Sequence, residues 1–89
     1  MATQDPPKLV YPCAYPIKVV GEHSEDFARV IMGIVQLHDP AVREEHVSAR
    51  PSSNGRFVSL TITFTAQGPE HIEALFLDLK ASGRVSIVL

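Results

Sequence analysis

The feature that most constrains the fold is the alternation of apolar and polar side chains in residues 56–64, RFVSLTITF. Successive side chains of a strand point to opposite faces, so this period of two predicts a strand with one buried and one wettable face. Antiparallel sheets can leave one face in water, so the same pattern favours an antiparallel sheet. We expect Val58, Leu60, Ile62 and Phe64 in the core and Phe57, Ser59, Thr61 and Thr63 on the open face.

Residues 22–40 and 68–83 carry the helical period instead. Ser24 is the expected N-cap of the first helix, Pro40 prevents its continuation, and Gly83 is the expected residue after the second helix. The apolar stripes are Phe27, Val30, Ile31, Ile34 and Val35 in the first helix, and Ile72, Leu75, Phe76 and Leu79 in the second.

Three further strands are predicted at residues 15–21, 46–50 and 84–89. The order strand, helix, strand, strand, helix, strand is the ferredoxin-like βαββαβ arrangement, an α+β sandwich. Its four-stranded antiparallel sheet would carry both helices on one face. Eighty-nine residues suffice for one domain, which we place at residues 11–89, after a flexible tail at residues 1–10.

The segment PSSNGR, residues 51–56, has two interpretations. Asn-Gly between two alternating runs predicts a tight hairpin turn of type I′, which needs a positive φ at both residues. Alternatively, backbone N–H groups and the Ser52 and Ser53 hydroxyls form an anion-binding nest beside Arg50 and Arg56.

The open face of the predicted sheet is basic and rich in hydroxyl groups, and we expect no acidic residue on it. The chain as a whole carries a net charge of only −2, so this distribution would polarise the molecule. The alternative is that these polar groups merely keep an exposed sheet soluble. The predicted face comprises Lys18, Val20, His46, Ser48, Arg50, Phe57, Ser59, Thr61, Thr63, Arg84, Ser86 and Val88.

Nucleic-acid binding and catalysis are both disfavoured. RNA-recognition modules of this topology stack bases on several sheet aromatics, but only Phe57 is aromatic on the predicted face. The four histidines are scattered, with no pair at the i, i+4 spacing of a helical zinc site. The single cysteine, Cys13, has no adjacent base to activate it. We therefore expect no enzyme activity, no metal and no cofactor.

The chain shows no secretory signal and no apolar run near the roughly 20 residues that span a bilayer. Together with the single cysteine, this predicts a cytoplasmic protein that does not engage membranes.

Four segments in order, YPIKVVG, FARVIMGIVQLHDP, RPSSNGRFVSLTITFTA and LFLDLKASGRVSIVL, resemble the YbeD-like family of small bacterial proteins of uncharacterised function. The resemblance covers residues 11–89, and its most diagnostic parts are residues 52–55 and 85–89. It implies the ferredoxin-like fold, a shape similar to ACT-type regulatory domains, and a regulatory role associated with lipoate. Residues 21–27, GEHSEDF, lack the Asp-Arg-Pro-Gly-like loop of ACT domains.

These observations predict a non-enzymatic regulatory or binding module that uses its open sheet face to bind an unknown protein partner or a small anionic ligand. An ACT-like sensor of an amino acid or a lipoate-like acid is one alternative. Another is a sheet-mediated homo-oligomer, such as a homodimer formed through the second strand. The candidate residues are Lys18, Arg50, Ser52, Ser53, Arg56, Phe57, Ser59 and Thr61.

Overall fold

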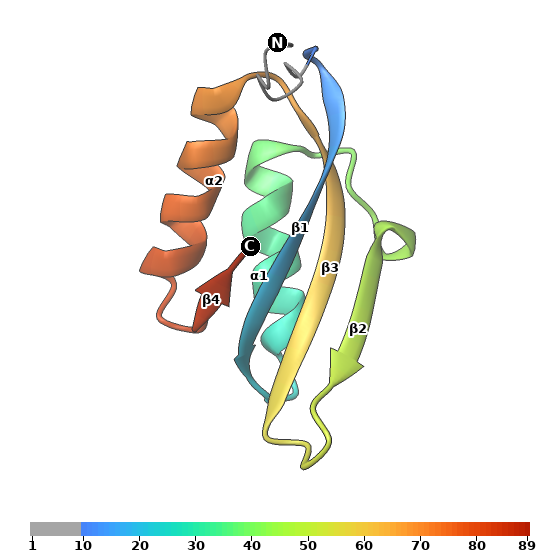
Figure 1. The fold of residues 1–89 in the computed structure, drawn as a ribbon, viewed down its shortest axis with the longest axis vertical. Helices are drawn as coiled ribbons and strands as arrows, with labels where there is room; N and C mark the ends of the chain where they lie inside the picture. Colours follow the sequence, from blue (N-terminus) through green and yellow to red (C-terminus); the bar gives the residue numbers. More distant parts are fainter. Residues whose placement is uncertain (1–9) are drawn as a thin grey trace, which may run out of the picture.

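The computed structural model describes residues 10–89, and their elements follow the predicted βαββαβ order. The predicted tail at residues 1–10 lies outside the described residues except for Val10. Figure 1 shows the elements, which are β1 (Cys13–Glu22), α1 (Phe27–His38), the 3-10 turn η1 (Glu44–His46), β2 (Val47–Pro51), β3 (Phe57–Ala66), α2 (Pro69–Ala81) and β4 (Ile87–Val88).

Within residues 10–89 the strands form one four-stranded antiparallel sheet in the order β2-β3-β1-β4. The long strands β1 and β3 lie at its centre and pair over ten residues, from Cys13 opposite Ala66 to Glu22 opposite Phe57. The short strands β2 and β4 form the edges (Figure 1). The predicted ferredoxin-like fold is therefore confirmed.

The core lies between one face of this sheet and the two helices. The alternation predicted for residues 56–64 is confirmed, because Val58, Leu60, Ile62 and Phe64 are all buried. The helices bury their stripes against them and leave the other sheet face uncovered. The other core side chains include Ile17, Val19, Phe27, Ile31, Val35, Leu75 and Leu79.

Several predicted boundaries were wrong. Ser24 does not cap α1, because the N-cap is Asp26 and the Ser24 hydroxyl donates instead to the Asp26 carboxylate, at 2.9 Å. The last strand is shorter than predicted, since only Ile87 and Val88 are in β4. Gly83 does follow α2 with a positive φ of 76°, as predicted.

The hairpin between β2 and β3 is not a two-residue type I′ turn. Its connection spans residues 52–56, and only Gly55 has a positive φ, of 72°. The Gly55 N–H donates to the Ser52 carbonyl at 2.9 Å, which closes an ordinary turn before the left-handed glycine. The side chain of Asn54 accepts from the Arg56 N–H at 3.0 Å, and Asn54 itself lies outside the positive-φ region.

Gly21 is the point where the connection between α2 and β4 rests directly on β1. A Cβ atom at this position would collide with the carbonyl oxygen of Arg84 and would lie 2.5 Å from the Phe27 ring. Real Cβ atoms do not come this close to other heavy atoms. Position 21 therefore requires glycine because no space exists for a side chain.

We predict that Gly21→Ala destabilises the domain by roughly 1–3 kcal/mol, the usual cost of overpacking a core. Urea unfolding measures this change. The matched control is Gly33→Ala in α1, where a Cβ meets nothing within 4 Å. That variant should gain up to about 1 kcal/mol from helix propensity. Equal stabilities for Gly21→Ala and the wild type would contradict the close packing.

Candidate functional site

The uncovered sheet face carries two rows of side chains that cross the strands. In one row, Lys18 of β1 lies opposite Thr61 of β3, which lies opposite Ser48 of β2. In the next row, Val20 lies opposite Ser59, which lies opposite Arg50. The hydroxyl groups of β3 thus lie between a lysine on one side and an arginine on the other.

The predicted composition of this face was wrong at several positions. Glu22 lies opposite Phe57 on the open side, so the face does contain an acidic residue. Val88 packs against the core. Ile87, opposite Val20 and 51% exposed, and Leu89, 69% exposed and bonded to the Lys18 backbone, take the open side instead. The reason is the register of β4 on β1, which sets Val88 opposite the buried Val19 and Ile87 opposite Val20 of the open face. The alternation in β4 is therefore one residue out of phase with the prediction.

Two other residues predicted on this face lie elsewhere. His46 belongs to η1, where its Nδ1 accepts a hydrogen bond from the Arg43 N–H at 3.0 Å. Arg84 lies in the connection before β4, and its guanidinium binds the carboxylate of Asp26. Neither side chain therefore belongs to the open face.

The hydroxyl-rich hairpin uses much of its hydrogen-bonding capacity internally. The Ser52 hydroxyl donates to the Asn54 side chain at 2.8 Å and accepts from the Phe57 N–H at 3.1 Å. Ser53 is exposed, and the Arg56 guanidinium lies 5.4 Å from the centre of the Phe57 ring. The segment is thus a self-bonded turn that places Arg56 beside the open face.

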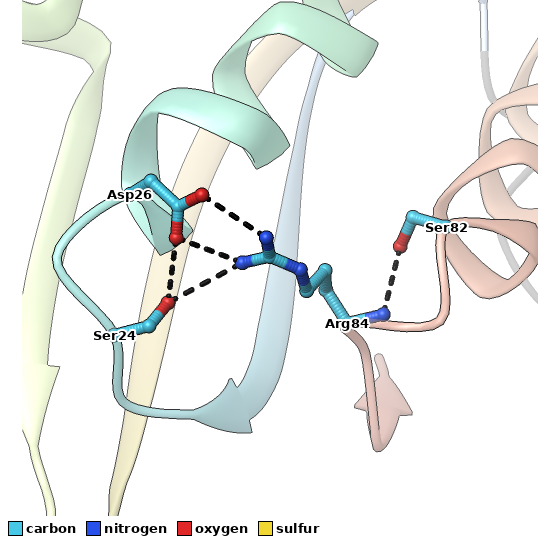
Figure 2. A network of polar contacts seen from close by, with 4 residues as sticks. All are labelled: Ser24, Asp26, Ser82 and Arg84. Carbon is cyan, nitrogen blue, oxygen red and sulfur yellow. Dashed lines mark hydrogen bonds and ion pairs between the residues drawn. The ribbon is translucent and has the colours of Figure 1, made fainter.

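A network of polar contacts joins the connection before α1 to the connection before β4 (Figure 2). The two guanidinium nitrogens of Arg84 donate to the two carboxylate oxygens of Asp26, at 2.9 and 3.0 Å. Ser24 accepts a further bond from Arg84 at 3.3 Å. These contacts hold the pKa of Asp26 well below its usual range. The hydrogen bonds from Arg84 have the largest effect, and the hydrogen bond from Ser24 has the next largest.

A pocket of about 590 Å³ adjoins this network where the open face ends. Glu22 and Phe57 belong to both the pocket and the open face, and Arg84 and Asp26 form part of its wall. The pocket therefore combines one apolar ring with acidic and basic groups, and its one arginine is already paired with an aspartate.

Two histidines hold the other end of the helical layer together. His71 donates from Nε2 to the His38 carbonyl at 2.7 Å, while its Nδ1 accepts from the Gln67 N–H at 3.0 Å. His38 contacts Asp78 at 2.6 Å. Among residues 10–89, no three His, Cys, Asp or Glu side chains are grouped so as to hold a metal ion. Cys13 is half-buried at the start of β1.

Residues 6–89 match the family model DUF493, described as a protein of unknown function. The chain belongs to this family. The resemblance to the YbeD-like family is thereby confirmed. A UPF0250 protein of Azotobacter vinelandii is 44% identical over 84 residues, covering 93% of this chain and 91% of that protein. Another from Hahella chejuensis is 43% identical, with coverage of 97% and 94%.

Solved structures share the fold. The solution structure of protein HP0495 from H. pylori has a TM-score of 0.79 at 14% identity, covering 97% of this chain and 90% of that one. The ACT domain of GTP pyrophosphokinase from Chlorobium tepidum has a TM-score of 0.66 at 17% identity, with coverage of 85% and 92%. Neither likeness carries a function to this DUF493 chain. None of the helices in residues 10–89 is both long and apolar enough to cross a membrane.

The Asp26–Arg84 pair was not foreseen from the sequence. Its partners are 58 residues apart, and no local pattern connects them. Only the topology gives a signal, because the connections before α1 and before β4 meet at the same end of the sheet.

We predict that Asp26→Asn lowers the melting temperature most at neutral pH. The folded-state pKa of Asp26 is depressed, so the pair stabilises the fold above the ordinary carboxyl pKa of about 3.9 and loses this effect as the pH falls. The difference between wild type and variant should therefore shrink as the pH falls below about 5, where the carboxyl group becomes protonated in the unfolded chain but stays ionised in the folded one. Thermal unfolding across this range tests it.

The control is Glu73→Gln, which changes an exposed carboxylate of α2 and should leave the melting temperature near that of the wild type. A difference between wild type and Asp26→Asn that stays constant with pH would show that the ion pair does not stabilise the fold.

Proposed function

We propose that this DUF493 chain is a non-enzymatic regulatory module of the bacterial cytoplasm that binds an anionic ligand or protein partner through its open sheet face. The observation that carries the proposal is the pair of adjacent rows in which Lys18 and Arg50 flank the hydroxyls of Thr61 and Ser59. Helices cover the opposite face, so these groups remain accessible to a partner.

The spacing of the two cations favours an extended partner over a single small anion. Lys18 lies on β1 and Arg50 on β2, with β3 between them, so their backbones are roughly 10 Å apart across the sheet. Between them, the Thr61 hydroxyl can donate to carboxylate or phosphate oxygens. The Ser59 hydroxyl donates to the Arg50 carbonyl at 3.4 Å and can accept from an amide. Val20 and Ile87 continue the second row with apolar surface. The face therefore suits an acidic segment with apolar side chains.

The non-enzymatic part of the proposal is supported by how the histidines are used. His46 and His71 each accept a backbone hydrogen bond at Nδ1, and His71 donates its other ring nitrogen to a backbone carbonyl. With both of its nitrogens engaged, the His71 ring is not available for proton transfer. The shift of the Asp26 pKa is downward, which also does not create a general base near neutral pH.

A second candidate function is ACT-like sensing of an amino acid or a lipoate-like acid. It is favoured by the likeness to the ACT domain of GTP pyrophosphokinase and by the pocket of about 590 Å³ beside Arg84. A ligand carboxylate would have to compete with Asp26 for that guanidinium. This competition makes the pocket the weaker of the two sites.

We predict that amide chemical-shift titration distinguishes these functions. The panel comprises amino acids, lipoate, octanoate, nucleotides, a short RNA and an acidic peptide. Binding to the open face should shift the amides of Lys18 and of residues 48–61, because this segment of β2, hairpin and β3 carries most of the candidate side chains of the uncovered face. Binding in the pocket should instead shift residues 22–26 and 83–86.

Charge reversal then tests the open face. Lys18→Glu should weaken binding of the acidic peptide about tenfold, the equivalent of about 1.4 kcal/mol, and adding Arg50→Glu should weaken it further. The matched control is Lys80→Glu, the same change on an exposed position of α2. If Lys80→Glu weakens binding as much as Lys18→Glu, or if the double variant binds normally, the open-face proposal is wrong.

A further inference from the structure

A groove runs along α1 on the helical side of the molecule, away from the open sheet face. It has a volume of about 1120 Å³ and lies between α1 and the segment that contains η1. The groove exists because the helices do not cover β2, whose core-side residues Ala49 and Pro51 are exposed. Its two walls are Glu25, Ala28, Arg29, Met32, Gly33 and Gln36 on one side, and Arg43, Glu44, Glu45 and Val47 on the other.

The α1 wall is complementary to a second copy of itself. Ala28, Arg29, Met32, Gly33 and Gln36 recur at helical spacing, and Glu25 lies in the turn just before the helix. The sequence positions of the six residues are symmetric about the midpoint between Val30 and Ile31. When two copies of α1 pack antiparallel about this midpoint, Ala28 of one lies opposite Gly33 of the other. These small residues allow the two helix backbones to approach closely, and a Cβ at Gly33 meets nothing within its own chain.

The charges of the groove match the same arrangement. The Gln36 side chain donates to the Val42 carbonyl at 2.8 Å, which places Arg43 near the C-terminal half of the stripe. Antiparallel packing brings Glu25 of the second copy to this end, where it meets Arg43. It also directs Arg29 toward the wall that contains Glu44 and Glu45. Within residues 10–89, none of the five charged groove residues forms an ion pair, and these are Glu25, Arg29, Arg43, Glu44 and Glu45.

Pairing of β2 edges is a poorer route to a dimer. The Ser52 N–H donates to the Phe57 carbonyl, so by alternation the outward backbone groups of β2 belong to Val47, Ala49 and Pro51. Proline has no N–H, and the Val47 N–H already donates to the Glu44 carbonyl. Only the Ala49 N–H remains for an added strand, so β2 is a blunted edge.

We propose that the occupant of the groove is the α1 stripe of a second copy, giving a two-fold symmetric dimer with antiparallel α1 helices. A symmetric interface needs a surface that is complementary to itself, which this stripe and its opposite wall provide. One helix stripe is about 18 Å long, so the contact lies toward the small end of stable interfaces. The dimer is therefore reversible and depends on concentration, and it leaves the open sheet face uncovered.

Sedimentation equilibrium of the full chain over a wide concentration range tests the dimer. The wild type should rise from 9.8 kDa toward twice that mass. Gly33→Gln should remain monomeric, because its side chain blocks the helix contact, while unfolding at a urea midpoint no lower than that of the wild type. The matched control Ala74→Gln, at an exposed position of α2, should dimerise like the wild type. A monomeric wild type, or a Gly33→Gln variant that dimerises normally, overturns the proposal.

Charge exchange tests the geometry independently of the small residues. Glu25→Arg alone and Arg43→Glu alone should each raise the dimer dissociation constant several-fold, and the double variant should restore most of the affinity. Failure of the double variant to recover affinity overturns the antiparallel arrangement. Neither residue lies on the open sheet face, so this result is separable from that of the ligand titration.

Discussion

The pairing of β1 with β3 is the interaction on which the rest of this structure depends. Ten consecutive residue pairs join the two strands, and the same register sets Ile17 beside Ile62 and Val19 beside Leu60. A shift of one residue in this pairing would point these buried side chains toward the solvent. The burial of one face of the sheet therefore fixes the register. The position of every other element follows, because both helices pack on this apolar face and both edge strands extend it.

The helical layer is fixed at its two ends by different chemistry. At one end, His71 of α2 binds the last carbonyl of α1, and Asp39 accepts the Thr65 N–H at 2.8 Å. At the other end, Gly21 lets the Arg84 backbone rest on β1, and the Arg84 side chain reaches Asp26. Both contacts therefore position the connection between α2 and β4. Gly21 leaves room for the backbone of this connection, and the ion pair with Asp26 holds the Arg84 side chain.

The sequence predicted the fold well because its strongest signals are periodic. Alternation in residues 56–64 and the helical stripes identify which faces are buried, and their order gives the topology. The errors occur where periodicity is weak or irrelevant. The six residues 84–89 form a strand of only two, too short to define its own phase, so Val88 was placed on the wrong face. Glu22 was missed because β1 extends past the glycine expected to end it.

The candidate site was less predictable than the fold, because it depends on contacts between distant residues. Lys18, Arg50, Ser59 and Thr61 were placed correctly on one face, since strand alternation alone determines this. Arg84 was assigned to the same face, but its bidentate contact with Asp26 directs its charge elsewhere. Local pattern can place a side chain on a face, but it gives no information about a partner 58 residues away.

The two sides of the sheet offer surfaces of different kinds. Within residues 10–89, the rows of the open face that contain Lys18 and Arg50 hold no Asp or Glu side chain, so this charge is available to a partner of opposite sign. The groove along α1 contains both signs, with three carboxylates and two guanidinium groups, which suits a copy of itself. Because the groove lies on the helical side of the sheet and the open face lies on the other side, occupation of one surface does not block the other. A dimer formed through α1 would therefore display two open faces, and a partner with two acidic segments could bind both, with higher affinity than a single face provides.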